Sequence, residues 1–419
     1  MEIGNPEIAA ASIPREFSAE SKLLVRGLAV LSAMASTLAV ALVAVPSMAC
    51  YGATRIVESI SPLRSAYQLF SHVYDRFIDR LGQKILRDPR DTPALRLMLS
   101  VTVSAVPIFA IQMVLRKLNL WLVIAFYLSL YGSQFRRFVR MFSVKHLEAH
   151  RRHGYFSKKY DSICGRYLEF FLGYLYGNVP ELDRTVHVRL HHRENAGPDD
   201  TATTRGYDRT SRLDFLRYLS NNIWTALGLA PYIYFRARGD EINRRRLLGG
   251  MVRYFVFFGA VFLYEWRIGI FFALVPFLCM NFISALTAWV QHAFYDPARP
   301  DDYFADTVTV IDHVNFMNEG YHLCHHHRSG LHWTEMPAHL ERIRERMRNS
   351  GSLVFRDLDF MSLFVELTVL RRMDVVAERL VPWEPMNHEQ KLALLARRTR
   401  LGRTRTEDMK APEVALQRT

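Results

Sequence analysis

Apolar residues in this 419-residue chain gather in long blocks that are separated by polar and basic stretches. A helix needs about 20 apolar residues to cross the hydrocarbon core of a bilayer. Five stretches approach this length: 27–50, 97–115, 118–132, 254–266 and 268–291. Only a few polar residues separate the second stretch from the third, and the fourth from the fifth. The pattern therefore predicts two transmembrane helical hairpins, preceded by an additional apolar helix at 27–50.

Arginine and lysine residues lie at the ends of both predicted hairpins. Those after the first hairpin are Arg136, Arg137, Arg140 and Lys145, and those before the second are Arg236, Arg238, Arg244, Arg245, Arg246 and Arg253. Positively charged flanks remain in the cytoplasm, so we expect both hairpins to cross from that side and the polar segments to stay there. The net charge of +13 fits anionic lipids better than nucleic acid, because no nucleic-acid-binding motif is present.

Most of the 16 histidines fall in three short polar segments. KHLEAHRRHG carries His146, His150 and His153, HVRLHHREN carries His187, His191 and His192, and YHLCHHH carries His322, His325 and His326. Residues three or four apart share a face of a helix, which groups the first three histidines and pairs His187 with His191. Adjacent histidines such as His191 and His192 diverge by about 100° around a helix, so they can serve two different metal ions.

This number of imidazoles exceeds what one metal ion needs. A zinc ion is satisfied by about four ligands, so the inventory implies two metal ions. His292 closes the last apolar stretch, in TAWVQHAFYD, at the end where the three segments are expected to meet, and we count it with them. Cys324 lies inside the third segment, but nitrogen ligands suit oxygen chemistry better than an oxidisable thiolate. The four cysteines show no spacing typical of disulfides or zinc fingers.

The order of these features resembles the membrane fatty acid desaturase superfamily, and its bacterial members in particular. The resemblance covers roughly residues 97–340 and lies in the two hairpins, in boxes of the form H-x3-H, H-x3-H-H and H-x2-H-H, and in an extra histidine before the third box. HHRENAGPDDT and NEGYHLCHHHRSGLHWTEMP also look like that family. The resemblance implies two iron ions (Fe2+/Fe3+), with O2 as co-substrate. The implied iron ligands are His146, His150, His187, His191, His192, His292, His322, His325 and His326.

Two departures from the family's pattern bear on this ligand set. Related enzymes place an asparagine one helical turn before the extra histidine, whereas this chain has Ala288 there. His327 also offers an alternative third box made of His322, His326 and His327, although we favour His325 and His326.

Other residues near the boxes are candidates for a hydrogen bond to the second nitrogen of a ligand imidazole, a partner that such imidazoles commonly have. Carboxylates suit this role better than further histidines, because they accept the ring proton. The histidine candidates are His153, His313 and His332, and the carboxylate candidates are Glu194, Asp199, Asp200, Asp312 and Glu319.

The resemblance implies an oxidoreductase, an acyl desaturase that inserts a double bond into a fatty acyl chain. A membrane hydroxylase or an acetylenase is the alternative, because these reactions differ in how the substrate is positioned rather than in the ligands. A membrane metal transporter is a third hypothesis. It would carry histidines inside the spans, where this chain has only His292 at one end.

Electrons for such a reaction are expected from an external carrier, a ferredoxin or a similar protein, because the chain has no haem-binding or flavin motif. The other expected partners are an acyl lipid or acyl thioester as substrate and the membrane lipids, with no nucleic acid. We expect an integral protein of a bacterial inner membrane, with its active site on the cytoplasmic face.

The chain is expected to be an all-α membrane protein in which a helical cytoplasmic domain caps the hairpins and holds the di-iron site. Residues 1–96 would form an N-terminal region, residues 97–340 a desaturase-like membrane and di-iron domain, and residues 341–419 a C-terminal helical region with a basic tail. The tail after Arg397, with Arg398, Arg400, Arg403 and Arg405, is expected to be solvated and disordered.

Overall fold

The computed structural model describes residues 19–312 and 315–399, and nearly all of its regular structure is helical. The helices before the second hairpin are α1 (Ala19–Ser59), α2 (Ser61–Ile85), α3 (Thr92–Leu115), α4 (Leu120–Tyr131), α5 (Arg136–Ala149), α6 (Lys158–Cys164), α7 (Gly173–Leu175), α8 (His192–Glu194), α9 (Arg212–Ala226) and α10 (Leu229–Ala237). The later helices are α11 (Glu241–Tyr264), α12 (Trp266–Gly269), α13 (Val275–Gln291), α14 (Tyr303–Asp306), α15 (His322–His327), α16 (Met336–Arg342), α17 (Arg344–Ser350), α18 (Phe360–Phe364), α19 (Met373–Arg379) and α20 (His388–Thr399). Four segments are π-helical: η4 (Leu168–Leu172), η5 (Asp183–His191), η6 (Ile270–Leu274) and η9 (Val365–Val369). Within the described residues, the sheet is limited to the parallel pair β1 (Thr309–Ile311) and β2 (Val354–Arg356).

Four helical segments are long and apolar enough to cross a membrane, which confirms the expected class of all-α membrane protein. They are Leu23–Ile56, Pro89–Leu115, Glu241–Tyr264 and Trp266–Gln291. The first lies within α1, the second contains α3, and the last two form the second hairpin. The other limb of the first hairpin is shorter than its apolar stretch suggested. α4 has 12 residues and extends about 18 Å, against the roughly 30 Å of a hydrocarbon core.

Both ends of α4 follow from its sequence. The Asn119 side chain accepts hydrogen bonds from two amides in the first turn of α4, as an N-cap residue does. Gly132, directly after α4, has a φ of 66°, a conformation that glycine adopts without steric cost. The chain turns there into α5, which carries the first histidine box away from the apolar helices.

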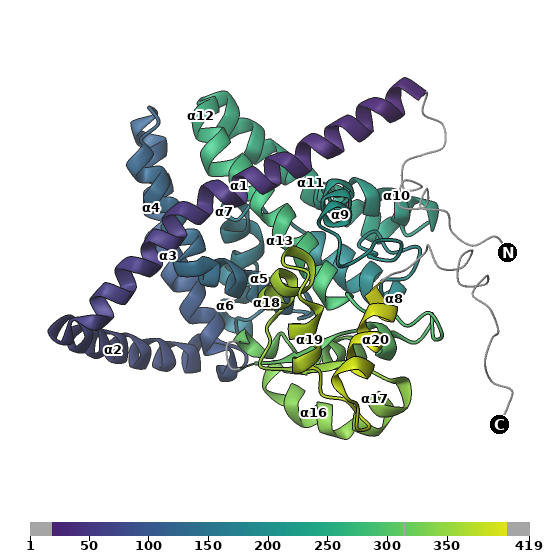
Figure 1. Ribbon diagram of the computed structural model, residues 1–419. Helices are drawn as coiled ribbons and strands as arrows, with labels where there is room; N and C mark the ends of the chain where they lie inside the picture. The colour runs from purple at the N-terminus through teal and green to yellow at the C-terminus, as the bar shows by residue number, and fades with distance from the viewer. Residues whose placement is uncertain (1–18, 313–314, 400–419) are drawn as a thin grey trace, which may run out of the picture.

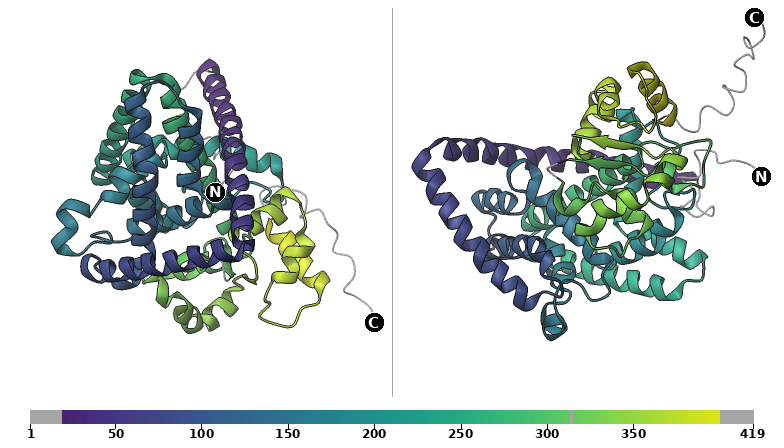
Figure 2. Two further views of the ribbon diagram at one scale, coloured as in Figure 1. Left: turned by 90° about the vertical axis from the view of Figure 1, so that its left-hand side faces the viewer. Right: turned by 90° about the horizontal axis from the view of Figure 1, so that it is seen from below.

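α1 packs against α4 and α13, so the N-terminal apolar helix belongs to the same bundle as the hairpins (Figure 1). In the left view of Figure 2, α2 lies across one end of this bundle, with α16 and α17 below it. α2 exposes Leu69, Val73 and Phe77, which follow one another at intervals of four residues. A helix with such an apolar face typically lies in the membrane interface. α2 thus lies at the edge of the molecule, at the end of the apolar helices that is nearer to the cap (Figure 1).

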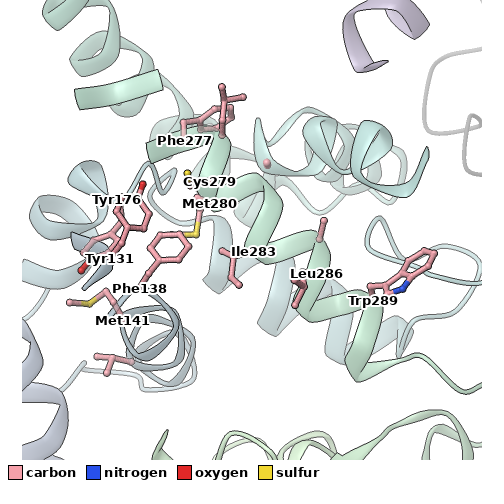
Figure 3. Packing of buried hydrophobic residues seen from close by; sticks show 14 of the residues in the cluster. Tyr131, Phe138, Met141, Tyr176, Phe277, Cys279, Met280, Ile283, Leu286 and Trp289 are labelled. Atoms are coloured by element: carbon pink, nitrogen blue, oxygen red, sulfur yellow. The ribbon is translucent and has the colours of Figure 1, made fainter. Parts of the chain in front are cut away.

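α13 runs through the centre of the molecule. In its apolar window 72% of the residues are buried, against 28% in each of the other three candidate spans, so α13 is surrounded by protein. Figure 3 shows Phe277, Met280 and Trp289 of this helix among the side chains of the core. The indole nitrogen of Trp289 donates a hydrogen bond of 3.0 Å to the Thr368 hydroxyl. The C-terminal end of α13 therefore has a fixed position.

The C-terminal helices pack onto the residues that follow α13. Arg398 was expected in a solvated tail, and this prediction was wrong, because α20 extends to Thr399 and buries that side chain. The Arg398 guanidinium lies 2.8 Å from an Asp296 carboxylate oxygen and donates to the Gly351 carbonyl at 2.8 Å. Arg400, Arg403 and Arg405 lie outside the described residues. The division of the chain at residues 96 and 340 stays a prediction.

Candidate metal centre

The histidine boxes come together from four places in the chain, at the end of the bundle where α13 stops. The contributing elements are α5 with the residue that follows it, η5 with the residue that follows it, the residue after α13, and α15. In chain order they supply His146, His150, His187, His191, His192, His292, His322, His325 and His326.

The ring nitrogens of these histidines form two adjacent groups. In the first histidine group, His146, His150, His187 and His325 each offer a nitrogen within 4.8 Å of the others. In the second histidine group, the same holds for His191, His292, His322 and His326. His192 lies with the first group, since its Nε2 atom is 3.0 Å from the Nε2 atoms of both His187 and His325. The structure thus brings together all nine histidines that the resemblance implied.

The second box is divided between the groups by the geometry of η5. In this π-helical segment the amide of His192 bonds to the carbonyl of His187, five residues earlier. The wider turn brings both His191 and His192 beside His187, and the nitrogens of His187 and His192 lie in the first group. His191 faces the second group. His187 and His191 were expected to share a face, and their stacked rings, with centres 5.3 Å apart, agree with this, although their nitrogens belong to different groups.

The third box is divided by ordinary α-helical geometry. His325 and His326 are neighbours in α15, and the rotation of about 100° between them directs His325 to the first group and His326 to the second. His327 lies on a further face of α15, where its Nδ1 atom is 2.9 Å from Nε2 of His339. The box that the structure assembles is the one favoured from the sequence, and His327 is outside it.

Hydrogen bonding alone does not account for the packing of these nitrogens. The Nε2 atom of His325 has three other ring nitrogens near it, those of His146, His192 and His187, at 2.9, 3.0 and 3.2 Å. A neutral imidazole has one N–H and one lone pair, so four such nitrogens cannot all pair with one another. The Nε2 atom of His150 is buried and has no hydrogen-bond partner among the described residues. Lone pairs that converge in this way fit a bound cation.

Burial favours the neutral form of eight of these imidazoles by lowering their pKa values. Loss of solvation, with a smaller contribution from neighbouring histidines, lowers the pKa of His146 to about 3 and the pKa of His150 to about 2. The same causes lower the pKa of His192 to about 2. A neutral imidazole has a lone pair to give to a metal ion. The protonation state of the groups therefore suits ligation.

Among the described residues, His191 and His326 have a partner for the ring nitrogen that faces away from the groups. Nδ1 of His191 lies 2.6 Å from a carboxylate oxygen of Asp200, which is buried. Because a carboxylate only accepts, Nδ1 of His191 carries the proton and its Nε2 lone pair is directed to the second group. Nδ1 of His326 lies 3.0 Å from the amide oxygen of Asn195.

Asn195 was not anticipated from the sequence. It ends the short helix α8 with a φ of 47°, a left-handed conformation that asparagine tolerates better than most residues. The stretch HHREN contains this signal, since an asparagine just after a helix commonly takes that conformation. What the sequence does not contain is the direction in which its side chain then points.

Three other carboxylate candidates contact different partners. Glu194 accepts a hydrogen bond from the Tyr234 hydroxyl, and Asp199 pairs with Arg238 on the surface. Glu319 accepts a hydrogen bond from a serine hydroxyl of α5 and lines a cavity that is described below. Of the five carboxylates, Asp200 is the one for which the structure describes a bond to one of the nine histidines.

Of the other histidine candidates, the described ones, His153 and His332, lie outside both groups. His153 was expected on one face with His146 and His150, but α5 ends at Ala149 and His153 is exposed near Asp161, so this expectation was wrong. His332 pairs with the Asp91 carboxylate at 3.2 Å. His313 lies outside the described residues.

Two cavities adjoin the first histidine group. The larger cavity has a volume of about 650 Å3, with His322 and His325 on its buried wall and Arg136 and Arg140 exposed at its rim. Half of the other lining side chains are apolar, and they include Phe142, Leu147, Ile283, Leu286, Phe316 and Met336. The smaller cavity has a volume of about 110 Å3 and shares His146, Thr287 and Gln291 with the larger one. Ala288 lines the smaller cavity.

Comparison with known proteins agrees with this geometry. The family model described as fatty acid desaturase matches residues 119–357, which is more than half of the chain and includes all nine histidines. No curated protein and no solved structure matches the chain. The chain belongs to the fatty acid desaturase family.

Proposed function

We propose that this chain is an acyl desaturase that holds two iron ions in its two histidine groups and uses O2 to insert a double bond into a fatty acyl chain. Membership in the family implies an oxidoreductase that acts on acyl lipids at a membrane. The observation that carries the finer proposal is the placement of two groups of converging imidazoles at the inner end of a cavity that is lined in part by apolar side chains. Its volume of about 650 Å3 falls within the range of roughly 300–1,000 Å3 that is usual for small-ligand pockets.

The two histidine groups would hold the two ions close together, because His191 and His192 are neighbours in the chain and face different groups. Imidazole suits iron among the transition metals. When bound, the irons would supply the reduction of O2 and the cleavage of unactivated C–H bonds, which no side-chain acid or base achieves.

The electron balance of this reaction requires a donor. Reduction of O2 to two molecules of water takes four electrons and four protons. The two C–H bonds that are broken supply two of each, so two electrons and two protons must come from elsewhere. The proposal therefore includes an external electron carrier, a ferredoxin or a similar protein, since the chain has no haem-binding or flavin motif.

The protein's own side chains would position the acyl chain. Apolar residues of the larger cavity, among them Leu147, Ile283 and Met336, would bury methylene groups, each worth about 0.8 kcal/mol. Arg136 and Arg140 at the rim would face the polar end of an acyl lipid or acyl thioester. The position in which the chain is held beside the first histidine group would decide between removal of two hydrogens and hydroxylation.

The proposal places this site on the cytoplasmic face of a bacterial inner membrane, within a catalytic domain of residues 97–340. Two features support that orientation. The basic residues after α4 and at the start of α11 belong on the cytoplasmic side. The histidine groups lie at the same end of the spans as these basic residues, at the C-terminal end of α13.

Metal content and product mass test the proposal. Purified full-length protein should contain about two iron ions per chain, and membranes incubated with labelled acyl substrates should give a product that is lighter by two hydrogens. A product heavier by one oxygen would identify a hydroxylase, and loss of four hydrogens an acetylenase. A single zinc ion per chain without O2 consumption would exclude all three.

Replacement of Asp200 by asparagine is expected to weaken iron binding about 10- to 100-fold, the usual cost of losing a partner that orients a ligand histidine. The amide can donate to Nδ1 of His191, which would favour the wrong tautomer. Competition with a chelator measures the affinity. The matched control is Asp199→Asn, since Asp199 is the adjacent residue but forms an exposed ion pair with Arg238. An equal loss of iron affinity in both variants would mean that the substitutions disturb the loop that carries Asp199 and Asp200, and not the bond to His191.

A further inference from the structure

A third cavity opens beside the first histidine group and carries an unusual number of arginines. It has a volume of about 540 Å3 and shares only Leu147 with the larger cavity. Its walls come from the segment between α2 and α3, the residues after α5 and the turn after α15. We refer to it as the arginine pocket, after Arg87, Arg90, Arg151, Arg152 and Arg328.

The arginine pocket has a net positive charge. Two of its arginines are paired with carboxylates, Arg151 with Asp91 and Arg90 with Asp88. Three further arginines are exposed and form no ion pair with any residue of 19–312 or 315–399: Arg87, Arg152 and Arg328. Exposed charges of one sign at a concave surface attract a partner of the opposite sign and raise its rate of association.

His150 connects this pocket with the proposed metal centre. It is partly exposed and lines the arginine pocket, but its Nε2 atom is fully buried. Its ring centre lies 4.4 Å from that of His325 and 4.7 Å from that of His192, both beside it in the first group. The four histidines of the second group are all buried. His150 therefore offers a short path between the solvent and the first group.

We propose that the arginine pocket is the docking site of an acidic one-electron carrier protein, and that electrons pass from this carrier through His150 to the metal centre. The inference rests on the proposed function, which needs two electrons from outside in each turnover. The inference adds to that function the place where the electrons enter the protein and the charge of the carrier that delivers them. Arginines near a membrane also bind anionic lipid headgroups. Binding of a headgroup, however, would not require that His150 line the pocket and contact the other residues of the first histidine group.

A paired charge reversal tests the proposal on the full-length, metal-loaded protein in nanodiscs. The test variant carries Arg152→Glu and Arg328→Glu. The control variant carries Arg342→Glu and Arg379→Glu, which are exposed, lie outside the pocket and have no ion pair among the described residues. The probe is a reduced, acidic [2Fe–2S] ferredoxin. Its affinity is measured by calorimetry and its rate of electron transfer by stopped-flow absorbance, with dithionite as a small reductant for comparison.

We expect the test variant to lose at least about tenfold in the rate of reduction by ferredoxin, with a matching loss of affinity and a weaker dependence on salt. Its reduction by dithionite and both reactions of the control variant should stay at the wild-type rate. Equal ferredoxin kinetics in the test variant and the wild type would overturn the proposal. The proposal would also be overturned if the test variant bound ferredoxin like the wild type and lost only its binding to vesicles that contain anionic lipid. If dithionite fails to reduce even the wild type, the proposed function fails, while the affinity measurement still decides where the carrier docks.

Discussion

Alanine in place of His292 is expected to abolish desaturation as completely as alanine in place of His325, and to leave one of the two proposed iron ions unbound. His292 reaches the second group from the end of α13, and its Nε2 atom lies 3.2 Å from that of His191. His325 is the central residue of the first group. The loss of activity should exceed the roughly 10- to 100-fold effect of losing an outer partner. Iron per chain and the yield of unsaturated product are the measurements.

His327 provides the control for these variants. It is adjacent to His326 in the same helix, but its ring faces His339 and neither histidine group. The variant His327→Ala should therefore keep two iron ions and most of its activity. Turnover at the wild-type level in His292→Ala would show that His292 is only a polar residue at the end of α13. The second group would then have three protein ligands.

The sequence predicts the members of the site better than their arrangement. The spacing of His322 and His326 places them on one face of α15, and both lie in the second group. In η5 the same reasoning pairs His187 with His191, whose rings stack, but it does not predict that His192 also lies beside His187, because nothing in DRTVHVRLH distinguishes a π-helix from an α-helix. The prediction for His153 fails for another reason. The end of α5 is set by the turn that follows it, and not by the histidine spacing.

A similar limit applies to the fold. Long apolar blocks suffice to find the spans at 23–56 and 266–291, because a bilayer demands length and apolarity together. Apolar composition does not reveal where a helix stops, so α4 came out shorter than its apolar stretch. Charge is misleading in the opposite way at Arg398. A basic stretch indicates solvent exposure, yet a buried carboxylate and carbonyls on distant segments hold that side chain inside.

Replacement of Arg209 by methionine is expected to cause the largest loss of stability among single changes outside the histidine groups. The Arg209 side chain is completely buried, and burial lowers its pKa to about 10, so it is charged at physiological pH. Its guanidinium donates to the carbonyl oxygens of Thr204, Tyr207, Ala293 and Arg398, at 3.2, 2.6, 3.0 and 3.0 Å. It thus joins three segments that are distant in the chain.

Methionine has a similar length but no donor, so four buried carbonyl groups would lose the guanidinium. Those of Thr204 and Arg398 keep a backbone amide, while those of Tyr207 and Ala293 have no other partner among the described residues. Each unsatisfied group costs about 1–3 kcal/mol, and relief of the buried charge offsets part of the sum, so we expect a net loss of roughly 3 kcal/mol or more. Chemical unfolding in detergent micelles measures it. The control, Arg217→Met, removes an exposed ion pair with Asp214 and should change stability by no more than about 0.5 kcal/mol.

The same variant connects stability with the metal centre. Ala293 follows His292 directly, and the Thr204 hydroxyl donates to the His292 carbonyl at 3.0 Å, so the segment that Arg209 holds is the one that positions His292. Arg209→Met should therefore release iron from the second group at denaturant concentrations where the first group still keeps its ion. Simultaneous loss of both ions at the unfolding midpoint would contradict this, and would mean that Arg209 stabilises the whole fold without a separate effect on the site.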